Sequence, residues 1–176
     1  MISKRMDKYE ITAAYAQFCA SFEPDFYFVL NYQPHKGREL SFGELSRQVR
    51  QLFYQLEVDE WGYERRKSRR GLKSARIERL VCIERASAYH ANILMKRYNA
   101  MSNDQLIQHI RSNWLEIQRM EHDADTSYLM NTSHIEIKNL SAVCAYVSKD
   151  TAKANARNED VLCMRASFIR KHSNRR

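Results

Sequence analysis

The sequence has little glycine and proline, four and two residues in a chain of 176, so no long flexible linker is expected. No apolar run approaches the roughly 20 residues that a membrane-spanning helix requires. The first residues are charged and no apolar segment follows them, which argues against a secretory signal. The length suits a single domain over residues 1–176, and we expect it in the cytoplasm, with no membrane partner.

Cysteine pairs of the kind that bind zinc are also absent. The four cysteines, Cys19, Cys82, Cys144 and Cys163, form no CxxC motif, so a structural zinc site is not expected. Because most of them lie in apolar surroundings, we interpret them as buried free thiols. Disulfides are not expected in a cytoplasmic protein.

Positive charge, by contrast, is abundant. Lysine and arginine number 29 against 21 aspartate and glutamate, which gives a formal net charge of +8. This surplus favours a polyanionic partner, either nucleic acid or an acidic membrane surface, over a basic but otherwise ordinary protein. Because the charge is clustered along the chain, nucleic acid is the preferred partner.

Two basic segments carry the clustered charge. The candidate DNA-binding residues of the first segment are Arg65, Arg66, Lys67, Arg69, Arg70, Lys73 and Arg76. Trp61 and Tyr63 flank this segment, where their rings can stack on unpaired bases. The second segment is a basic tail over residues 165–176. The alternative interpretation is a solvated loop and a frayed terminus.

Apolar residues at helical spacing predict four helices. Ser41 and Glu44 form a capping box at the start of one of them. The helices are expected over residues 4–22, from Ser41 to beyond residue 56, from Ser102 or Asn103 to about residue 121, and from residue 140 to about residue 154.

Runs of β-forming residues predict strands over 26–32, 78–85, 90–98 and 134–138, with a polar loop over 122–133. The short spacing between the second and third strands predicts a hairpin. Hairpins mixed with helices indicate an α+β fold, an antiparallel sheet with helices packed on one face.

Three residues of the predicted hairpin form a candidate metal site. His90 and Asn92 are two positions apart on one strand and therefore point to the same face, and Glu84 on the preceding strand can face the same point. Imidazole, carboxylate and amide groups suit Mn²⁺ or Mg²⁺, which would polarise a phosphate oxygen as a Lewis acid. Taken singly, these residues also fit a hydrogen-bonded histidine and a surface charge.

A candidate nucleophile lies on the last predicted helix. Tyr146 and Lys149 are three positions apart and therefore neighbours on the helix surface. A tyrosine hydroxyl has a pKa of about 10 and is a poor nucleophile unless something stabilises the phenolate. A nearby ammonium and a metal-bound phosphate would both do so. The alternative is a tyrosine packed in the core beside a surface lysine.

In their order along the chain, these motifs resemble those of the HUH endonucleases, the tyrosine nucleases of rolling-circle replication initiators, relaxases and some transposases. Residues 26–32 resemble the first-motif strand of that family, residues 90–94 its His-hydrophobe-His strand, and residues 146–149 its YxxK helix. Glu84 falls where some members carry an acidic ligand. The resemblance covers about residues 26–154 and departs at Asn92, where most members have a second histidine and some viral relatives have glutamine.

The resemblance implies a ferredoxin-like or RRM-like nuclease fold and a metal-dependent endonuclease that nicks and rejoins single-stranded DNA. Tyr146 would be the nucleophile, Lys149 its electrostatic helper, and His90, Asn92 and Glu84 the ligands of Mn²⁺ or Mg²⁺. The products would be a 5′-phosphotyrosine and a free 3′-hydroxyl that can prime replication.

The partner implied by the resemblance is single-stranded or hairpin DNA at the replication origin of a plasmid or phage. No GxxxxGK[ST] phosphate loop occurs in the sequence, so a host helicase and polymerase are expected to extend the product. The protein would act in the cytoplasm of a prokaryotic cell or in association with its nucleoid.

Two other functions stay open. A non-catalytic DNA-binding regulator on the same fold is favoured by Asn92, because asparagine is shorter than the glutamine that some viral relatives carry, and its metal affinity is therefore in question. An RNA-binding ferredoxin-like module would need exposed aromatic residues on the sheet face, and Tyr27 with Val29 is a weak match to that requirement.

Overall fold

The computed structural model describes residues 8–32, 34, 38–68, 74–85, 88–119, 129–132, 135–149, 162–163 and 165–170. Within these ranges the helices and strands, in chain order, are α1 (Lys8–Ser21), β1 (Phe26–Leu30), α2 (Phe42–Trp61), α3 (Tyr63–Lys67), β2 (Arg79–Arg85), β3 (Tyr89–Met95), α5 (Asn103–Gln118), β4 (Met130–Asn131) and α6 (Leu140–Ser148).

The four strands form one antiparallel sheet in the order β2-β3-β1-β4. β2 and β3 form the expected hairpin, with a register that runs from Arg79 opposite Met95 to Arg85 opposite Tyr89. The chain order β1-α2-β2-β3-α5-β4, together with this strand order, is that of a ferredoxin-like fold. The predicted α+β class with an antiparallel sheet is therefore confirmed.

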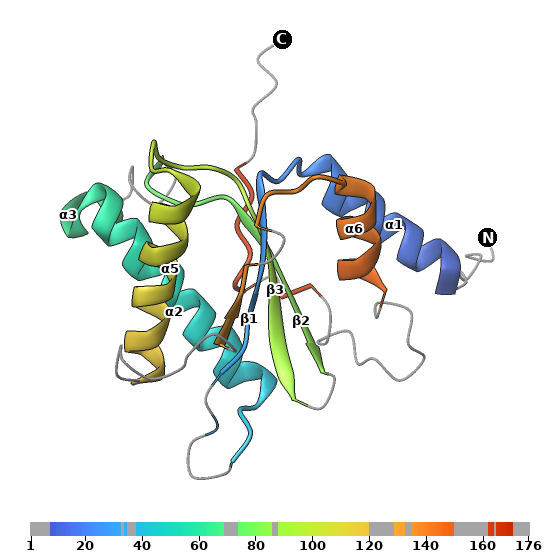
Figure 1. The fold of residues 1–176 in the computed structure, drawn as a ribbon, viewed down its shortest axis with the longest axis horizontal. Coiled ribbons are helices and arrows are strands. Elements are labelled where there is room, and N and C mark those ends of the chain that lie inside the picture. Colours follow the sequence, from blue (N-terminus) through green and yellow to red (C-terminus); the bar gives the residue numbers. More distant parts are fainter. Residues whose placement is uncertain are drawn as a thin grey trace.

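Helices cover both faces of the sheet, with α2, α3 and α5 on one side and α1 and α6 on the other (Figure 1). Phe26, Phe28 and Leu30 of β1 belong to the core beneath α2 and α5, whereas Tyr27 belongs to a second core with residues of α1 and α6. The expectation of helices on one face only is therefore wrong. Its physical reason lies in β1, where apolar residues on both faces of the strand require cover on both sides.

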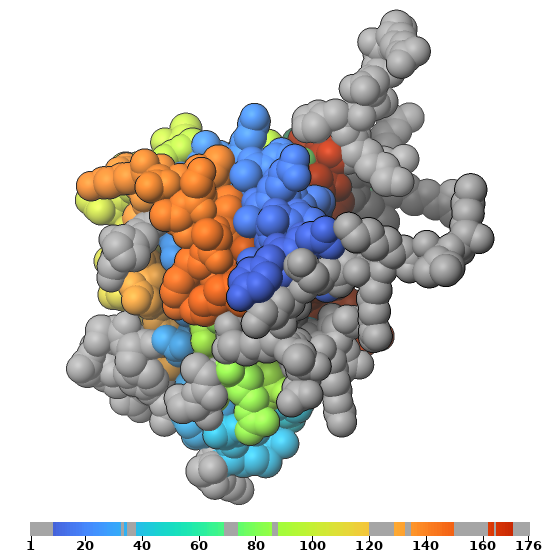
Figure 2. Space-filling model, turned by 90° about the vertical axis from the view of Figure 1, so that its right-hand side faces the viewer, coloured from blue at the N-terminus to red at the C-terminus, as the bar shows by residue number. Residues whose placement is uncertain are grey.

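The second face is closed by two helices that lie side by side. α1 and α6 together cover the sheet in the view of Figure 2. Four side chains of this layer, Cys19, Phe22, Cys144 and Val147, are buried against the sheet. α6 also carries Tyr146, the candidate nucleophile.

Local signals in the sequence set the starts of two long helices. Ser41 caps α2: its hydroxyl accepts a bond from the Glu44 N–H at 3.3 Å, and the Ser41 N–H donates to the Glu44 carboxylate at 2.9 Å. Ser102 and Gln105 form the same reciprocal box at the start of α5. Each box pairs N–H groups that the first helical turn leaves without a partner.

The C-terminal segment covers the outer edge of β2 (Figure 1). Arg79 and Phe168 exchange two backbone hydrogen bonds of 2.8 Å, and the Cys163 N–H donates to the Val81 carbonyl at 2.8 Å. The Val81 N–H in turn donates to the Ser167 hydroxyl at 2.9 Å. The expected basic tail therefore begins as an ordered strip along the sheet, and residues 171–176 lie outside the described residues.

The edge strand beside β1 differs from the expectation. β4 is Met130–Asn131, which falls inside the stretch expected to be a loop. Of the predicted strand over 134–138, the described residues 135–138 form an isolated bridge between Glu136 and Phe26, and the Tyr27 N–H donates to the Ile135 carbonyl at 3.0 Å. Hydrogen bonding to β1 therefore determines which residues form the edge strand, and the alternation of apolar and polar residues over 134–138 does not.

The remaining boundaries differ more modestly. α3 occupies the start of the segment expected to be a basic loop, α5 ends at Gln118, and the described part of the last helix ends at Ser148. All four cysteines are buried free thiols, as predicted. In the part of the chain that the structure describes, no helix is both long and apolar enough to cross a bilayer.

Candidate functional site

The three candidate metal ligands share the sheet face that α6 covers. Glu84 lies directly opposite His90 in the β2–β3 register, and Asn92 lies opposite Cys82, two positions further along the same face. The alternation of side chains along a strand brings these residues together, as the sequence predicts. The hairpin therefore gathers a carboxylate, an imidazole and an amide beneath the last helix.

Glu84 is the centre of this polar cluster. Its side chain is only 2% exposed, and one of its oxygens, Oε1, accepts a hydrogen bond of 2.6 Å from Asn92 Nδ2. The other oxygen, Oε2, lies 3.6 Å from His90 Nε2 and 3.6 Å from Lys149 Nζ. A buried carboxylate needs such partners, because burial without them strongly disfavours its charged form.

Asn92 is fully buried, and both polar atoms of its side chain are engaged. Its Oδ1 accepts a hydrogen bond of 2.8 Å from the Tyr27 hydroxyl, while its Nδ2 donates to Glu84. Burial is the largest cause that raises the pKa of Tyr27, and the nearby Tyr146 and Glu84 raise it further, so the hydroxyl stays protonated as a donor. The amide thus links Tyr27 to Glu84 instead of facing His90.

Tyr27 is the residue of this site that the sequence analysis did not assign to it. The signal available was its place in β1, because Tyr27 and Val29 lie on the same strand face and Val29 pairs with Asn92. A tyrosine in an otherwise apolar strand also needs a partner for its hydroxyl when buried. Finding that partner required the register between β1 and β3.

α6 brings the candidate nucleophile to the cluster. Asn139 caps the helix by accepting a bond of 3.0 Å from the Ala142 N–H. The Tyr146 ring packs edge-on against the Tyr27 ring, with centroids 6.4 Å apart, and the residue is 48% exposed. Lys149 Nζ lies 3.4 Å from the centroid of the Tyr146 ring, so its ammonium stands between that ring and Glu84.

Two hollows meet at Tyr146. One has a volume of about 730 Å³ and extends along α6 past Asn139 and Val143. The other, of about 350 Å³, includes His90 in its wall. Both are lined by Val29, Asn131 and Tyr146, so the exposed tyrosine and His90 face one open region. An extended ligand bound in this region would contact Tyr146 and His90 at the same time.

The donor atoms fit a divalent ion held partly by the protein. His90 Nε2 and Glu84 Oε2 face one another, and two such ligands leave room for water and a phosphate oxygen, as Mg²⁺ prefers. No group of three or more His, Cys, Asp or Glu side chains suited to a metal occurs among the described residues. His90 and Glu84 could therefore hold an ion only together with water or substrate oxygens, and the Lys149 ammonium lies 3.6 Å from the same Glu84 oxygen.

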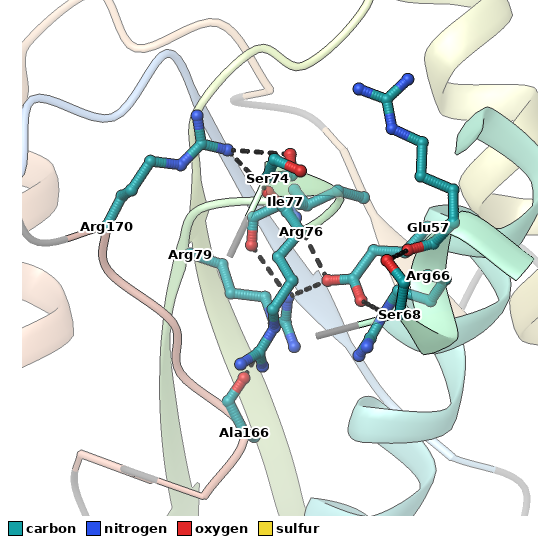
Figure 3. Close-up of polar contacts among 10 residues, drawn as sticks. Glu57, Arg66, Ser68, Ser74, Arg76, Ile77, Arg79, Ala166 and Arg170 are labelled. Carbon is teal, nitrogen blue, oxygen red and sulfur yellow. Dashed lines mark hydrogen bonds and ion pairs between the residues drawn. The ribbon is translucent and has the colours of Figure 1, made fainter. Parts of the chain in front are cut away.

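The predicted DNA-binding arginines and lysines that the structure describes are either exposed to solvent or held in structural contacts. Arg65 and Lys67 are exposed on α3. Arg66 instead forms an ion pair with the buried Glu57, Nε to Oε2 at 2.5 Å, and the buried Arg79 contacts Glu57 Oε1 at 2.8 Å (Figure 3). Arg66 is thus part of a structural cluster. Three further residues of the predicted set, Arg69, Arg70 and Lys73, lie outside the described residues.

Arg76 also has a structural contact. Its guanidinium lies 3.9 Å from the centroid of the Phe168 ring, and burial lowers its pKa. Trp61, expected to stack on bases, packs against Tyr98 with ring centroids 6.1 Å apart, whereas Tyr63 is half exposed. Within the described residues, the surface that suits DNA at this end of the molecule is therefore smaller than expected.

No protein family, curated protein or solved structure matches this chain.

Proposed function

We propose that this protein is a HUH-type endonuclease that nicks and rejoins single-stranded DNA through a tyrosine nucleophile. The observation that carries the proposal is the convergence of Tyr146, Lys149, Glu84 and His90, from one helix and two strands, beside one open region. Glu84 and His90 lie 56 or more positions before Tyr146 and Lys149 in the chain. Packing alone does not favour bringing a buried carboxylate into this group, because burying a polar group costs stability.

In the proposed reaction the Tyr146 oxygen attacks a DNA phosphorus. A bond forms between that oxygen and the phosphorus, and the bond from the phosphorus to the 3′ oxygen breaks. The tyrosine loses its proton, the leaving oxygen gains one, and the products are a 5′-phosphotyrosine and a free 3′-hydroxyl. Because one phosphoester replaces another, the reverse reaction rejoins the strand.

The residues around Tyr146 have distinct roles in this proposal. The Lys149 ammonium stabilises negative charge that develops on the tyrosine oxygen and the phosphate. His90 Nε2 and Glu84 Oε2 would hold a Mn²⁺ or Mg²⁺ ion, which when bound supplies Lewis-acid polarisation of a phosphate oxygen. The two hollows that share Tyr146 bind the strand on either side of the reacting phosphate.

The net charge of +8 supports a DNA substrate. Arg65 and Lys67 are exposed on α3, on the other side of the sheet from α6, so they would contact phosphates of a DNA segment away from Tyr146. As part of the proposal, the protein acts in a prokaryotic cytoplasm at the single-stranded or hairpin DNA of a plasmid or phage origin. A host helicase and polymerase would then use the free 3′-hydroxyl.

A cleavage assay tests the proposal. Oligonucleotides labelled at their 3′ end are incubated with the protein and Mn²⁺ and separated on a denaturing gel. We expect a labelled band that migrates with the protein, lost in Tyr146→Phe and retained in Tyr9→Phe, a control that removes a hydroxyl from an exposed tyrosine on α1. An adduct that persists in Tyr146→Phe would reject the nucleophile.

A non-catalytic DNA-binding regulator on the same fold is the second candidate. The observation in its favour is Asn92, whose amide is held in two hydrogen bonds where most HUH enzymes have a ligand. Salt-sensitive DNA binding with no adduct in Mn²⁺ would support this candidate. The RNA-binding alternative is weakened, because α1 and α6 cover the sheet face and Tyr27 is buried (Figure 2).

A further inference from the structure

We infer that Tyr27 and Asn92 are positioning residues that fix the orientation of Glu84, and that Asn92 acts through Glu84 instead of binding the metal itself. The inference rests on the proposed function, because it concerns how the same site presents its carboxylate to a cation. Its basis is a chain of hydrogen bonds, from the Tyr27 hydroxyl to Asn92 and from Asn92 to Glu84.

The direction of this chain follows from the chemistry of its end. An ionised carboxylate only accepts hydrogen bonds, so the amide must turn its NH₂ group toward Glu84. Asn92 Oδ1 then points the other way, to the Tyr27 hydroxyl at 2.8 Å, which must donate. With the amide reversed, its oxygen would face the carboxylate, and two acceptors would repel. Glu84 and Tyr27 thus lock the amide in one orientation.

With the amide held in this orientation, the two carboxylate oxygens of Glu84 have different partners. Oε1 is committed to Asn92 at 2.6 Å. Oε2 is left turned toward His90 and Lys149, each 3.6 Å away. Because Asn92 is fully buried, no water can replace the amide at Oε1 without a rearrangement. The carboxylate therefore offers its second oxygen at a fixed place, where a cation would also meet His90.

The two possible roles of Asn92 predict opposite effects of removing the Tyr27 hydroxyl. If Asn92 Oδ1 were a metal ligand, Tyr27→Phe would free that oxygen and metal binding would become tighter. If Asn92 positions Glu84, the variant leaves the amide unlocked and metal binding becomes weaker. The ring of residue 27 is kept, so its edge-on contact with Tyr146 is also kept.

The experiment is a titration of the full chain with Mn²⁺, in which electron paramagnetic resonance reports the free ion. We expect Tyr27→Phe to bind Mn²⁺ about tenfold more weakly than the wild type, the usual effect of losing a residue that orients a ligand. Tyr9→Phe is the matched control and should bind as the wild type does. Unchanged or tighter binding in Tyr27→Phe, or no binding by the wild type, would overturn the inference.

A second measurement needs no variant. In the wild type titrated with Mg²⁺, nuclear magnetic resonance should show the Asn92 side-chain NH₂ protons still protected from exchange, because the bond to Glu84 is kept. Loss of that protection on saturation with Mg²⁺ would contradict the positioning role.

The two proposals fail in different ways. A wild type that binds Mn²⁺ in a Tyr27-dependent way but forms no DNA adduct refutes the nuclease and supports the positioning role. A wild type that forms the adduct while Tyr27→Phe binds Mn²⁺ normally supports the nuclease and refutes the positioning role.

Discussion

The substitution Glu57→Gln should destabilise the fold strongly, because it removes the negative charge from the centre of a buried cluster (Figure 3). The Glu57 side chain is fully buried and accepts bonds from Arg66 Nε at 2.5 Å, Arg79 Nη1 at 2.8 Å and the Ile77 N–H at 3.1 Å. Glutamine has nearly the same shape, but its NH₂ group would face a guanidinium N–H, and two donors would then meet.

The size of the expected loss in unfolding free energy follows from the burial of the arginines that contact Glu57. Arg79 is only 3% exposed, and its pKa is already lowered to about 10 by burial, an effect that Glu57 opposes. Removing one partner of a buried ion pair costs about 3–5 kcal/mol, because the other charge is left uncompensated. Since Arg66 retains some exposure, we expect about 3 kcal/mol. For a chain of this size that loss lowers the midpoint of thermal unfolding by roughly 6–12 °C.

Urea denaturation followed by the fluorescence of Trp61 and Trp114 measures this loss. The control is Glu64→Gln, the same substitution on the exposed surface of α3, which should change the free energy of unfolding by less than about 0.5 kcal/mol. A loss below about 1 kcal/mol in Glu57→Gln, with an unchanged dependence on urea, would refute the reasoning.

Three further predictions concern other parts of the molecule. Lys149→Met should tighten Mn²⁺ binding several-fold while slowing adduct formation, because it removes a cation 3.6 Å from Glu84 Oε2; calorimetry showing weaker binding would contradict this. Ser167→Ala should cost about 1 kcal/mol and speed hydrogen exchange at the Val81 N–H, which loses its acceptor; unchanged exchange would count against the edge contact. The Arg38 hydrogen bond is the main cause that lowers the pKa of Glu44 to about 2. The stability that comes from the lowered pKa of Glu44 is therefore present above the unfolded pKa of about 4.3 and is lost as the pH falls toward 2. Because Ser41 also lowers this pKa, an acid titration of Arg38→Met should show a smaller loss, and an unchanged loss would contradict the role of Arg38.

Much of the fold could be predicted because the signals are local. The capping box of Ser41 and Glu44 and the short connection of the β2–β3 hairpin depend only on neighbouring residues. The two residues of β4, Met130 and Asn131, carry no such pattern, because the strand exists through its pairing with β1. The two-sided cover of the sheet had a signal in the continuous apolar run over residues 26–30, which favours burial on both faces.

In the candidate site, too, the features with local signals could be predicted, and those that depend on strand pairing could not. The spacing of His90 and Asn92 placed both on one strand face, and the spacing of Tyr146 and Lys149 made them neighbours on α6. The hydrogen bond from Tyr27 to Asn92 joins residues 65 positions apart and requires the register of β1 against β3. Similarly, a glutamate four positions after Phe53 on the apolar stripe of α2 signals a buried charge, but the sequence does not reveal which arginine pairs with it.

The most direct test of the proposed function is to identify the residue that becomes linked to DNA. The protein is incubated with single-stranded DNA and Mn²⁺, digested with nuclease and protease, and its peptides are analysed by mass spectrometry. The proposed mechanism predicts a 5′-linked nucleotide on Tyr146 alone. A nucleotide on another residue, or no modified peptide although the DNA is bound, would contradict it.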